Sequence, residues 1–241
     1  MSRDAESRRI ARTEFGRPVA LEAGAGTGKT TTLVARLVAW LVGPGWIDAR
    51  TTLRGSVAIT FTEAAAAEMH ERLTQALSEL ARRHGVALCC PAVERGGDDV
   101  YNACVVFDRS GRELVRYRKI HPWLPELHVA PGDPPFGSFE LDGVRFALAI
   151  CYDVHFLGDE AADELEAADV LLLPTAWVDD RRDGRAMLAD LARDFDVWIV
   201  NANWGVGTPR VRGQGGSRVV DPRGRIVARA GDGVEVIYCG L

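Results

Sequence analysis

Hydrophobic and polar positions fall into distinct blocks between residues 144 and 177. An apolar run from Phe146 to Ile150 predicts a buried strand, and a second run from Val170 to Leu173 predicts another strand that stops at Pro174. The acidic, alanine-rich segment between the two runs has helical character. A strand, a helix and a second strand in this order predict an α/β fold, whose functional residues gather at the C-terminal ends of strands.

One cysteine occupies such a strand end. Cys151 follows the first apolar run directly and is followed by the polar pair Tyr152 and Asp153. A thiol at this position is a candidate nucleophile. The alternative is a buried cysteine without chemical function, because free cysteines are often part of a hydrophobic core.

The chain uses arginine for nearly all its positive charges. Of 29 lysines and arginines only two are lysines, Lys29 and Lys119. A lysine supplies a compact, movable ammonium that arginine cannot replace. We therefore predict a functional role for both lysines, with chance surface placement as the alternative.

Further local patterns predict the remaining elements. Alanine-rich and leucine-rich segments predict helices over Glu63–Arg83 and Asp183–Phe195. The segments Asp108–Glu113 and Asp221–Arg225 have the composition of turns between apolar strands. The charged N-terminus, residues 1–13, has the composition of a polar, helical lead-in rather than a signal peptide.

Composition limits the classes of function. The 241 residues are 47% hydrophobic, enough for a sizeable core, and the net charge of −5 gives no general attraction to nucleic acid. Five cysteines without CxxC spacing argue for a reducing compartment and against a disulfide framework or a zinc site. No apolar run reaches the length of about 18 residues that a membrane span needs. We expect a cytoplasmic protein without a membrane partner.

The segment Val19–Leu41 has the pattern of a phosphate-binding loop. A short apolar strand, a glycine-rich loop and a Lys-Thr pair that opens a helix are typical of such loops. Backbone N–H groups around Gly26 and Gly28 would surround the phosphates of ATP, Lys29 would reach the β- and γ-phosphates, and Thr30 would bind Mg²⁺. A loop that keeps this shape and binds no nucleotide is the alternative.

Residues 8–73 resemble the N-terminal segment of UvrD/RecB-like DNA helicases. The resemblance rests on the phosphate loop, with Ala23 where the strict pattern has glycine, and on VAITFTEAAAAEMHERL at Val57–Leu73. It implies threonines that contact single-stranded DNA. The later helicase motifs are not found: no acidic pair follows a strand, and no arginine finger or second motor domain is recognisable. Such a segment would bind nucleotide but hydrolyse it poorly, and DNA is not expected as a partner.

Residues 76–241 resemble the carbon–nitrogen hydrolase (nitrilase) family through several motifs in family order. These motifs are YNACVVFDRSGRELVRYRKIHPW, PELHVAPGD, ICYD, ADVLLLPTAW, IVNANWGVG and GQGGSRVVDPRGRIVARAG. The resemblance implies a four-layer αββα sandwich, formed partly by self-association into a homo-oligomer. It also implies a small-molecule amide or nitrile substrate and no cofactor for the hydrolase.

The same resemblance implies roles for three residues. Cys151 would attack the substrate carbon and form a thioester or thioimidate. Lys119 would stabilise the tetrahedral intermediate together with a backbone N–H after the nucleophile. Glu126 would be the second glutamate of the family, which orients the lysine or aids proton transfer.

The chain therefore has the organisation of a composite. A helicase-like segment, residues 1–73, joins a hydrolase domain, residues 74–241, that lacks its usual first strands. The join falls near Glu71–Ala76 inside a predicted helix, which suggests one continuous fold. The opening segment replaces the region that carries the family's general base, and Glu63, which follows the apolar strand Val57–Phe61, is our candidate for that role. The alternative is a glutamate at a helix N-terminus, where the helix dipole favours it.

Three hypotheses of function follow. The first is a thiol-dependent hydrolase of carbon–nitrogen bonds, with an amidase favoured. The second is a nucleotide- or DNA-binding remnant of a helicase with Lys29 as its main contact. The third is a hydrolase that has lost its general base and is catalytically inactive.

Overall fold

The computed structural model describes residues 3–14, 32, 34–36, 39, 63–124, 126–177, 184–204, 214–231 and 236–240. The chain separates into two compact units, residues 1–84 and 85–241. The division between the units falls at the end of the predicted long helix. The join of two family segments near Glu71–Ala76 stays a prediction.

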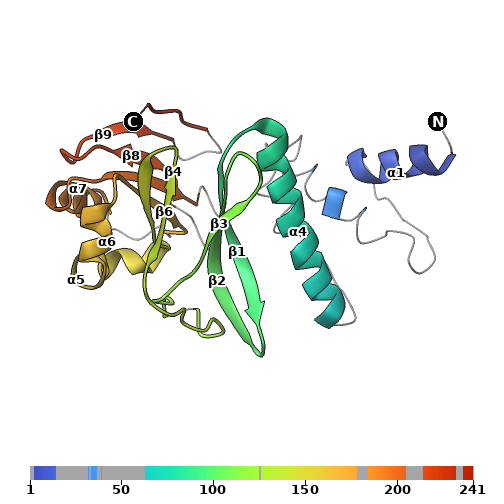
Figure 1. The fold of residues 1–241 in the computed structure, drawn as a ribbon, viewed down its shortest axis with the longest axis horizontal. Helices are drawn as coiled ribbons and strands as arrows, with labels where there is room; N and C mark the ends of the chain where they lie inside the picture. Colours follow the sequence, from blue (N-terminus) through green and yellow to red (C-terminus); the bar gives the residue numbers. More distant parts are fainter. Residues whose placement is uncertain are drawn as a thin grey trace. The chain divides into compact units, whose positions relative to one another are not determined.

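Unit 1 contains two long described helices, α1 (Arg3–Thr13) and α4 (Glu63–His84), both visible in Figure 1. Helix α1 confirms the helical lead-in, and α4 confirms the helix predicted over Glu63–Arg83. Alanine favours the helical conformation of α4, and Gly85, with φ of 61°, supplies the left-handed residue at its end.

The predicted phosphate-binding loop cannot be compared with the described part of unit 1. Its residues Gly26, Gly28, Lys29 and Thr30 lie outside the described residues, as does the predicted strand Val57–Phe61. A nucleotide site in this segment stays a prediction.

Unit 2 begins with a three-stranded antiparallel sheet. Its strands are β1 (Leu88–Gly96), β2 (Asp99–Phe107) and β3 (Glu113–Arg118), in that spatial order. The β2–β3 connection is the turn predicted from the sequence, and the Asp108 carboxylate stabilises it by accepting hydrogen bonds from the Ser110 and Arg112 N–H groups.

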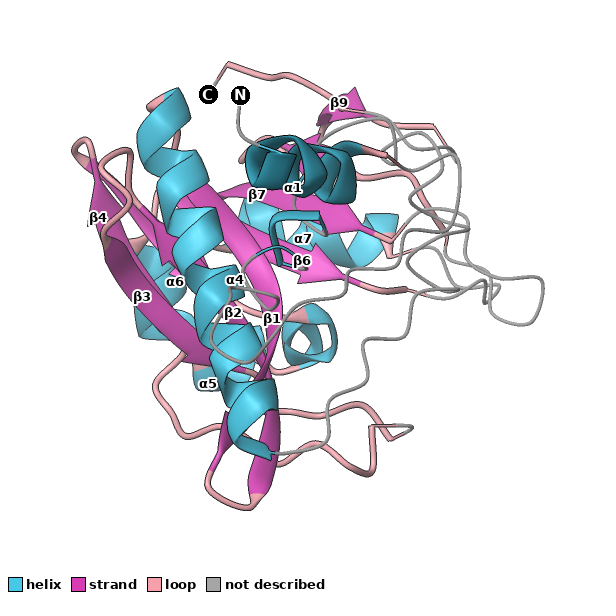
Figure 2. Cartoon of the chain, turned by 90° about the vertical axis from the view of Figure 1, so that its right-hand side faces the viewer, coloured by secondary structure: helices cyan, strands magenta, loops and turns pink. Residues whose placement is uncertain are grey.

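A second sheet of six strands follows in the order β4-β5-β6-β7-β8-β9. Strands β5, β6 and β7 are parallel to one another, whereas the remaining neighbours pair in antiparallel fashion. Figure 2 shows the strands of both sheets in magenta. The strands are β4 (Gly137–Leu141), β5 (Val144–Leu148), β6 (Val170–Thr175), β7 (Trp198–Asn203), β8 (Arg218–Val220) and β9 (Ile226–Arg229).

Two strand ends differ from the sequence prediction. Strand β5 ends at Leu148 rather than Ile150, because the Ile150 N–H donates to the Asp153 carboxylate at 2.9 Å and leaves the sheet. Strand β6 continues through Pro174 instead of stopping before it. Strand β5 pairs with β6 only as far as Leu172, so the missing N–H of Pro174 interrupts no pairing with β5.

Three helices cover one face of the larger sheet. They are α5 (Leu157–Glu160), α6 (Ala162–Ala167) and α7 (Arg185–Asp194), and Figure 1 shows them on the side of this sheet that faces away from the smaller sheet. The short α5 and α6 correspond to the acidic segment expected to be helical. Helix α7 lies within the range Asp183–Phe195 predicted for it.

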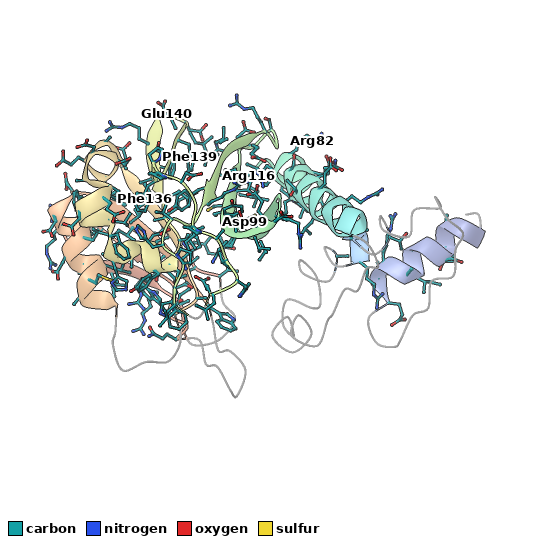
Figure 3. The ribbon with its side chains drawn as sticks, turned by 90° about the horizontal axis from the view of Figure 1, so that it is seen from below. Arg82, Asp99, Arg116, Phe136, Phe139 and Glu140 are labelled. Atoms are coloured by element: carbon teal, nitrogen blue, oxygen red, sulfur yellow. The ribbon has the colours of Figure 1, made fainter. Side chains whose placement is uncertain are left out.

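Both sheets and the helices share one hydrophobic core. It joins Cys104, Val106 and Tyr117 of the smaller sheet to Leu148, Leu171 and Ile199 of the larger sheet and to Leu165 and Leu188 of the helices. Aromatic pairs extend it: the Phe139 ring stacks on Phe146, with ring centroids 4.8 Å apart, and the Phe136 ring stacks on Tyr117, with ring centroids 6.1 Å apart (Figure 3).

Unit 2 is thus an α/β domain of two sheets with a helical layer. A second helical layer over the smaller sheet stays a prediction.

Candidate active site

Cys151 lies on a strained turn at the C-terminal end of the parallel strands. It opens a 3-10 helix, η1 (Cys151–His155), two residues after β5, and its φ is 51°. A residue with a β-carbon in this left-handed region costs about 1–3 kcal/mol, and such strain is concentrated at functional sites. In the α/β-hydrolase fold the nucleophilic serine lies on a comparably sharp turn after a strand.

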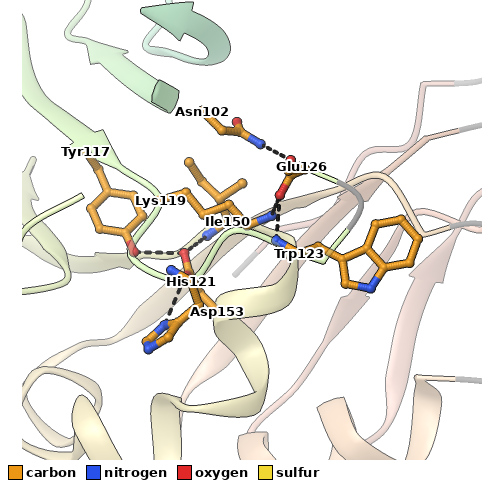
Figure 4. Close-up of polar contacts among 8 residues, drawn as sticks. All are labelled: Asn102, Tyr117, Lys119, His121, Trp123, Glu126, Ile150 and Asp153. Atoms are coloured by element: carbon orange, nitrogen blue, oxygen red, sulfur yellow. Dashed lines mark hydrogen bonds and ion pairs between the residues drawn. The ribbon is translucent and has the colours of Figure 1, made fainter. Parts of the chain in front are cut away.

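Lys119 follows β3 directly and is buried. Its side chain is 1% exposed, and Nζ donates to Glu126 Oε2 at 2.6 Å (Figure 4). Its backbone is fixed as well, since its N–H donates to Asn102 O and its carbonyl accepts from the Gly132 N–H, both at 2.8 Å. A buried ammonium requires such a partner because the loss of solvation is costly.

Glu126 is held by three donors. Oε2 accepts from Lys119 Nζ and from the Trp123 N–H at 2.7 Å, and Oε1 accepts from Asn102 Nδ2 at 2.9 Å. Burial raises the pKa of the Glu126 carboxyl, but these hydrogen bonds and the Lys119 charge outweigh burial and leave the pKa below its usual value. Glu126 is therefore an ionised group suited to orienting Lys119 rather than to exchanging protons.

The thiol of Cys151 lies within the electrostatic influence of these residues. Burial raises the pKa of Cys151, and the charges of Glu126 and Asp153 act in the same direction. The Ala176 N–H, which hydrogen-bonds the sulfur, and the Lys119 charge act to lower it. Lys119 and Glu126 are in contact, and both act electrostatically on Cys151. With its pKa raised overall, the thiol is protonated at neutral pH and needs a base before it can attack a carbonyl carbon.

The predicted general base cannot be placed against this thiol. Glu63 is the first residue of α4 in unit 1, and its side chain lies outside the described residues. Its role stays a prediction. The described carboxylates that act on the Cys151 sulfur are those of Glu126 and Asp153.

Two residues of this site were not predicted from the sequence. Asn102 on β2 binds Glu126 from 24 positions away in the chain. Asp153, 0% exposed, accepts hydrogen bonds from Tyr117, His121 and Ile150. The position of Asp153 two residues after the cysteine is a sequence signal, whereas no local pattern marks Asn102.

The adjoining strand ends are tied together by amides. Asn201, 1% exposed, donates from Nδ2 to Thr175 Oγ1 at 2.9 Å and to Leu173 O at 3.0 Å. Asn203 Oδ1 accepts from Thr175 Oγ1 at 2.8 Å and from the Trp177 N–H at 3.0 Å. These bonds hold both sides of Ala176, the residue whose N–H contacts the Cys151 thiol. Asn201 is thus a buried tie between β6 and β7.

Two kinds of feature are absent from the described part of the chain. Within those ranges no group of three or more His, Cys, Asp or Glu side chains is arranged to hold a metal ion. In the same part of the chain no helix combines the length and the apolar character that a membrane crossing requires.

Comparison with known proteins identifies one family. Residues 40–241 match the family described as carbon-nitrogen hydrolase. The matched range begins before α4 and therefore includes residues 40–73, the second half of the segment that resembles helicases.

Individual relatives agree with this match. The chain is 31% identical to the 2-oxoglutaramate amidase of Bacillus subtilis over 160 residues, which cover 64% of the chain and 61% of that protein. It is 28% identical to an omega-amidase of Homo sapiens over 192 residues, 70% of the chain and 66% of that protein. Among solved structures, an amidase from Nesterenkonia sp. matches with a TM-score of 0.62 and 25% identity, over 69% of this chain and 65% of that one. The chain spans about three fifths of the length of the curated relatives it matches.

Proposed function

Because this chain belongs to the carbon–nitrogen hydrolase family, we propose that it hydrolyses the carbon–nitrogen bond of a small amide. In this proposal Cys151 is the nucleophile, Lys119 stabilises the oxyanion, and Glu126 orients Lys119. The observation that carries the proposal is a buried ammonium, 1% exposed and fixed by a carboxylate, within electrostatic range of a thiol on a strained turn. The relatives are named as amidases, which favours an amide over a nitrile.

The chemistry divides into two halves. The Cys151 sulfur attacks the carbonyl carbon while a base takes its proton, and the negative charge on the oxygen is stabilised by the Lys119 ammonium. Collapse of this intermediate breaks the carbon–nitrogen bond, and ammonia leaves with the proton. Water then adds to the thioester, the thiol is expelled with a proton, and a carboxylic acid is released.

The base of the first half is a separate part of the proposal. The Cys151 pKa is raised by burial, so the reaction requires a group that accepts the proton. Glu126 is poorly suited, since its carboxylate already accepts three hydrogen bonds and its pKa is lowered. We retain Glu63 as the candidate. Glu63→Gln should then slow ammonia release while leaving the Cys151 thiol present and reactive.

A solved relative supports the choice of nucleophile. In a mutant of the Nesterenkonia amidase, 25% identical to this chain, acrylamide has added to the active-site cysteine and the acetamide moiety of fluoroacetamide has become attached there. These two reactive amides therefore reach the cysteine of that mutant. Cys151, at a strand-end turn beside Lys119, is the residue of this chain for which we propose the same chemistry.

The test is ammonia release from a panel of small amides. The wild-type protein should release ammonia, Cys151→Ala should not, and the matched control Cys239→Ala, which changes an exposed cysteine, should behave as wild type. Turnover that survives Cys151→Ala would overturn the proposal. Labelling of Cys151 by fluoroacetamide without turnover of any amide would favour the hydrolase that lacks its base.

A further inference from the structure

Asp153 is a buried carboxylate with three donors. Oδ2 accepts from the Tyr117 hydroxyl at 2.8 Å and from the Ile150 N–H at 2.9 Å, and Oδ1 accepts from the His121 N–H at 2.9 Å (Figure 4). The side chain is 0% exposed.

The three donors flank both candidate catalytic residues. Tyr117 and His121 stand two positions before and two positions after Lys119, and Ile150 stands immediately before Cys151. One carboxylate therefore joins the segment that carries the ammonium to the turn that carries the sulfur. The bond to Ile150 also closes across Cys151, whose φ of 51° needs support from its surroundings.

The pattern of donors requires a carboxylate. The N–H groups of Ile150 and His121 can only donate, and they address different oxygens of Asp153. An asparagine in either orientation would turn its own NH₂ group toward one of these N–H groups. An ionised aspartate accepts all three bonds, and hydrogen bonds to a charged group are the stronger class.

The surrounding charges make the role of Asp153 distinguishable from a simple charge effect. The charges of Lys119, Glu126 and Asp153 act on the Cys151 thiol. The His121 ring faces Asp153, with Nδ1 3.3 Å from an Asp153 carboxylate oxygen. On its other side, Nε2 of this ring lies 3.2 Å from Glu160. As a nearby negative charge, Asp153 raises the pKa of Cys151, whereas Lys119 lowers it. Loss of the Asp153 charge would therefore lower the pKa of the Cys151 thiol, whereas displacement of Lys119 would raise it.

We propose that Asp153 is a positioning residue, whose three hydrogen bonds hold the Lys119 segment against the Cys151 turn and fix the ammonium beside the sulfur. The effect of Asp153 on catalysis rests on the proposed function. Its effect on the position of the Lys119 ammonium relative to the thiol does not, and the pH dependence of Cys151 alkylation measures that effect without turnover.

The experiment measures the rate of iodoacetamide alkylation of the Cys151 peptide by mass spectrometry as a function of pH. Asp153→Asn should move the pH midpoint upward by about one unit, because the thiol loses the influence of the ammonium. In a Lys119→Met background, where no ammonium is left to misplace, the same substitution should move the midpoint downward. Asp169→Asn, which changes an exposed carboxylate that accepts from the Arg145 N–H, is the matched control and should leave the midpoint unchanged.

A second variant keeps the proposal testable if Asp153→Asn does not fold. Tyr117→Phe removes one donor but retains the ring and the Asp153 charge, and it should move the midpoint upward by less than Asp153→Asn does. With an amide that is turned over, both variants should lower kcat more than they change KM, by up to about 10²-fold, as expected for misplacement of a catalytic group.

The direction of the shift in the alkylation midpoint decides whether Asp153 is a positioning residue. A downward shift in Asp153→Asn would assign Asp153 a charge effect, and an unchanged midpoint with a lower Tm would assign it structural support alone; both overturn the proposal. An upward shift without hydrolysis of any amide would support the positioning role while the proposed function fails. Hydrolysis combined with a downward shift would leave the proposed function standing and refute the positioning role.

Discussion

Two thiols in unit 2 lie in contrasting surroundings. Cys104 is 0% exposed within β2, where its Sγ lies 3.3 Å from Cys89 Sγ on β1, and Cys151 is partly exposed on the turn after β5. The pKa of Cys104 is raised mainly by the contact with Cys89 and then by burial. The pKa of Cys151 is raised by burial but opposed by the Ala176 N–H and Lys119.

The difference shows what makes a cysteine a candidate nucleophile. A backbone N–H acts to lower the pKa of each thiol, but only Cys151 lies partly exposed on a strand-end turn within the influence of an ammonium. Partly exposed cysteines near a positive charge can react, whereas cysteines buried in an apolar core are inert. Substitutions at the two cysteines and at the residues around Cys151 test this contrast.

The largest effect is expected for Cys151→Ala, which removes the attacking atom. Ammonia release from small amides should fall to the background rate. The same measurement on Cys104→Ser should retain turnover. Loss of activity in Cys104→Ser with full activity in Cys151→Ala would reverse the contrast.

Lys119→Met should have the next largest effect. Removal of the group that stabilises the oxyanion typically lowers kcat by about 10²–10³-fold. Steady-state kinetics should show this loss, and the alkylation midpoint of Cys151 should rise because the nearby positive charge is gone. A kcat within a factor of two of the wild-type value would show that Lys119 does not stabilise the oxyanion.

Glu126→Gln should lower kcat less, by up to about 10²-fold, through misorientation of Lys119. The amide retains the acceptor for Lys119 or for Asn102, but it cannot serve all three donors of the carboxylate. An increase in kcat would contradict the orienting role.

The smallest effect on activity is expected for Cys104→Ser, which tests the inert half of the comparison. A hydroxyl placed in this apolar core should lower the free energy of unfolding by about 1–3 kcal/mol. Urea denaturation measures this change. Stability equal to that of the wild type would show that the Cys104 site is less apolar than its neighbours suggest.

Much of the fold around the site was predictable from local patterns. The strand before Cys151, the following helices, β6 and α4 were expected from apolar runs and helical composition. The predicted C-terminal end of β5 was wrong by two residues, because the Ile150 N–H donates to the Asp153 carboxylate instead of to a neighbouring strand. A side-chain acceptor of this kind leaves no trace in the periodicity of the strand.

The site was predictable to a lesser degree. Cys151 was marked by its strand end, Lys119 by the rarity of lysine, and Glu126 by the family resemblance. Asp153 and Asn102 were missed because their partners are distant in the chain; Tyr117 and Asp153, for example, are 36 positions apart. Such convergence depends on how the two sheets pack, which local patterns do not determine.

The most direct test of the account is peptide mass spectrometry after exposure of the folded protein to fluoroacetamide, an amide that carries an electrophile. We predict addition of an acetamide group to Cys151, with Cys104 unmodified until the protein is unfolded. If Cys151 stays unmodified in the folded protein and reacts only after unfolding, the thiol is not presented to amides and the central claim is contradicted.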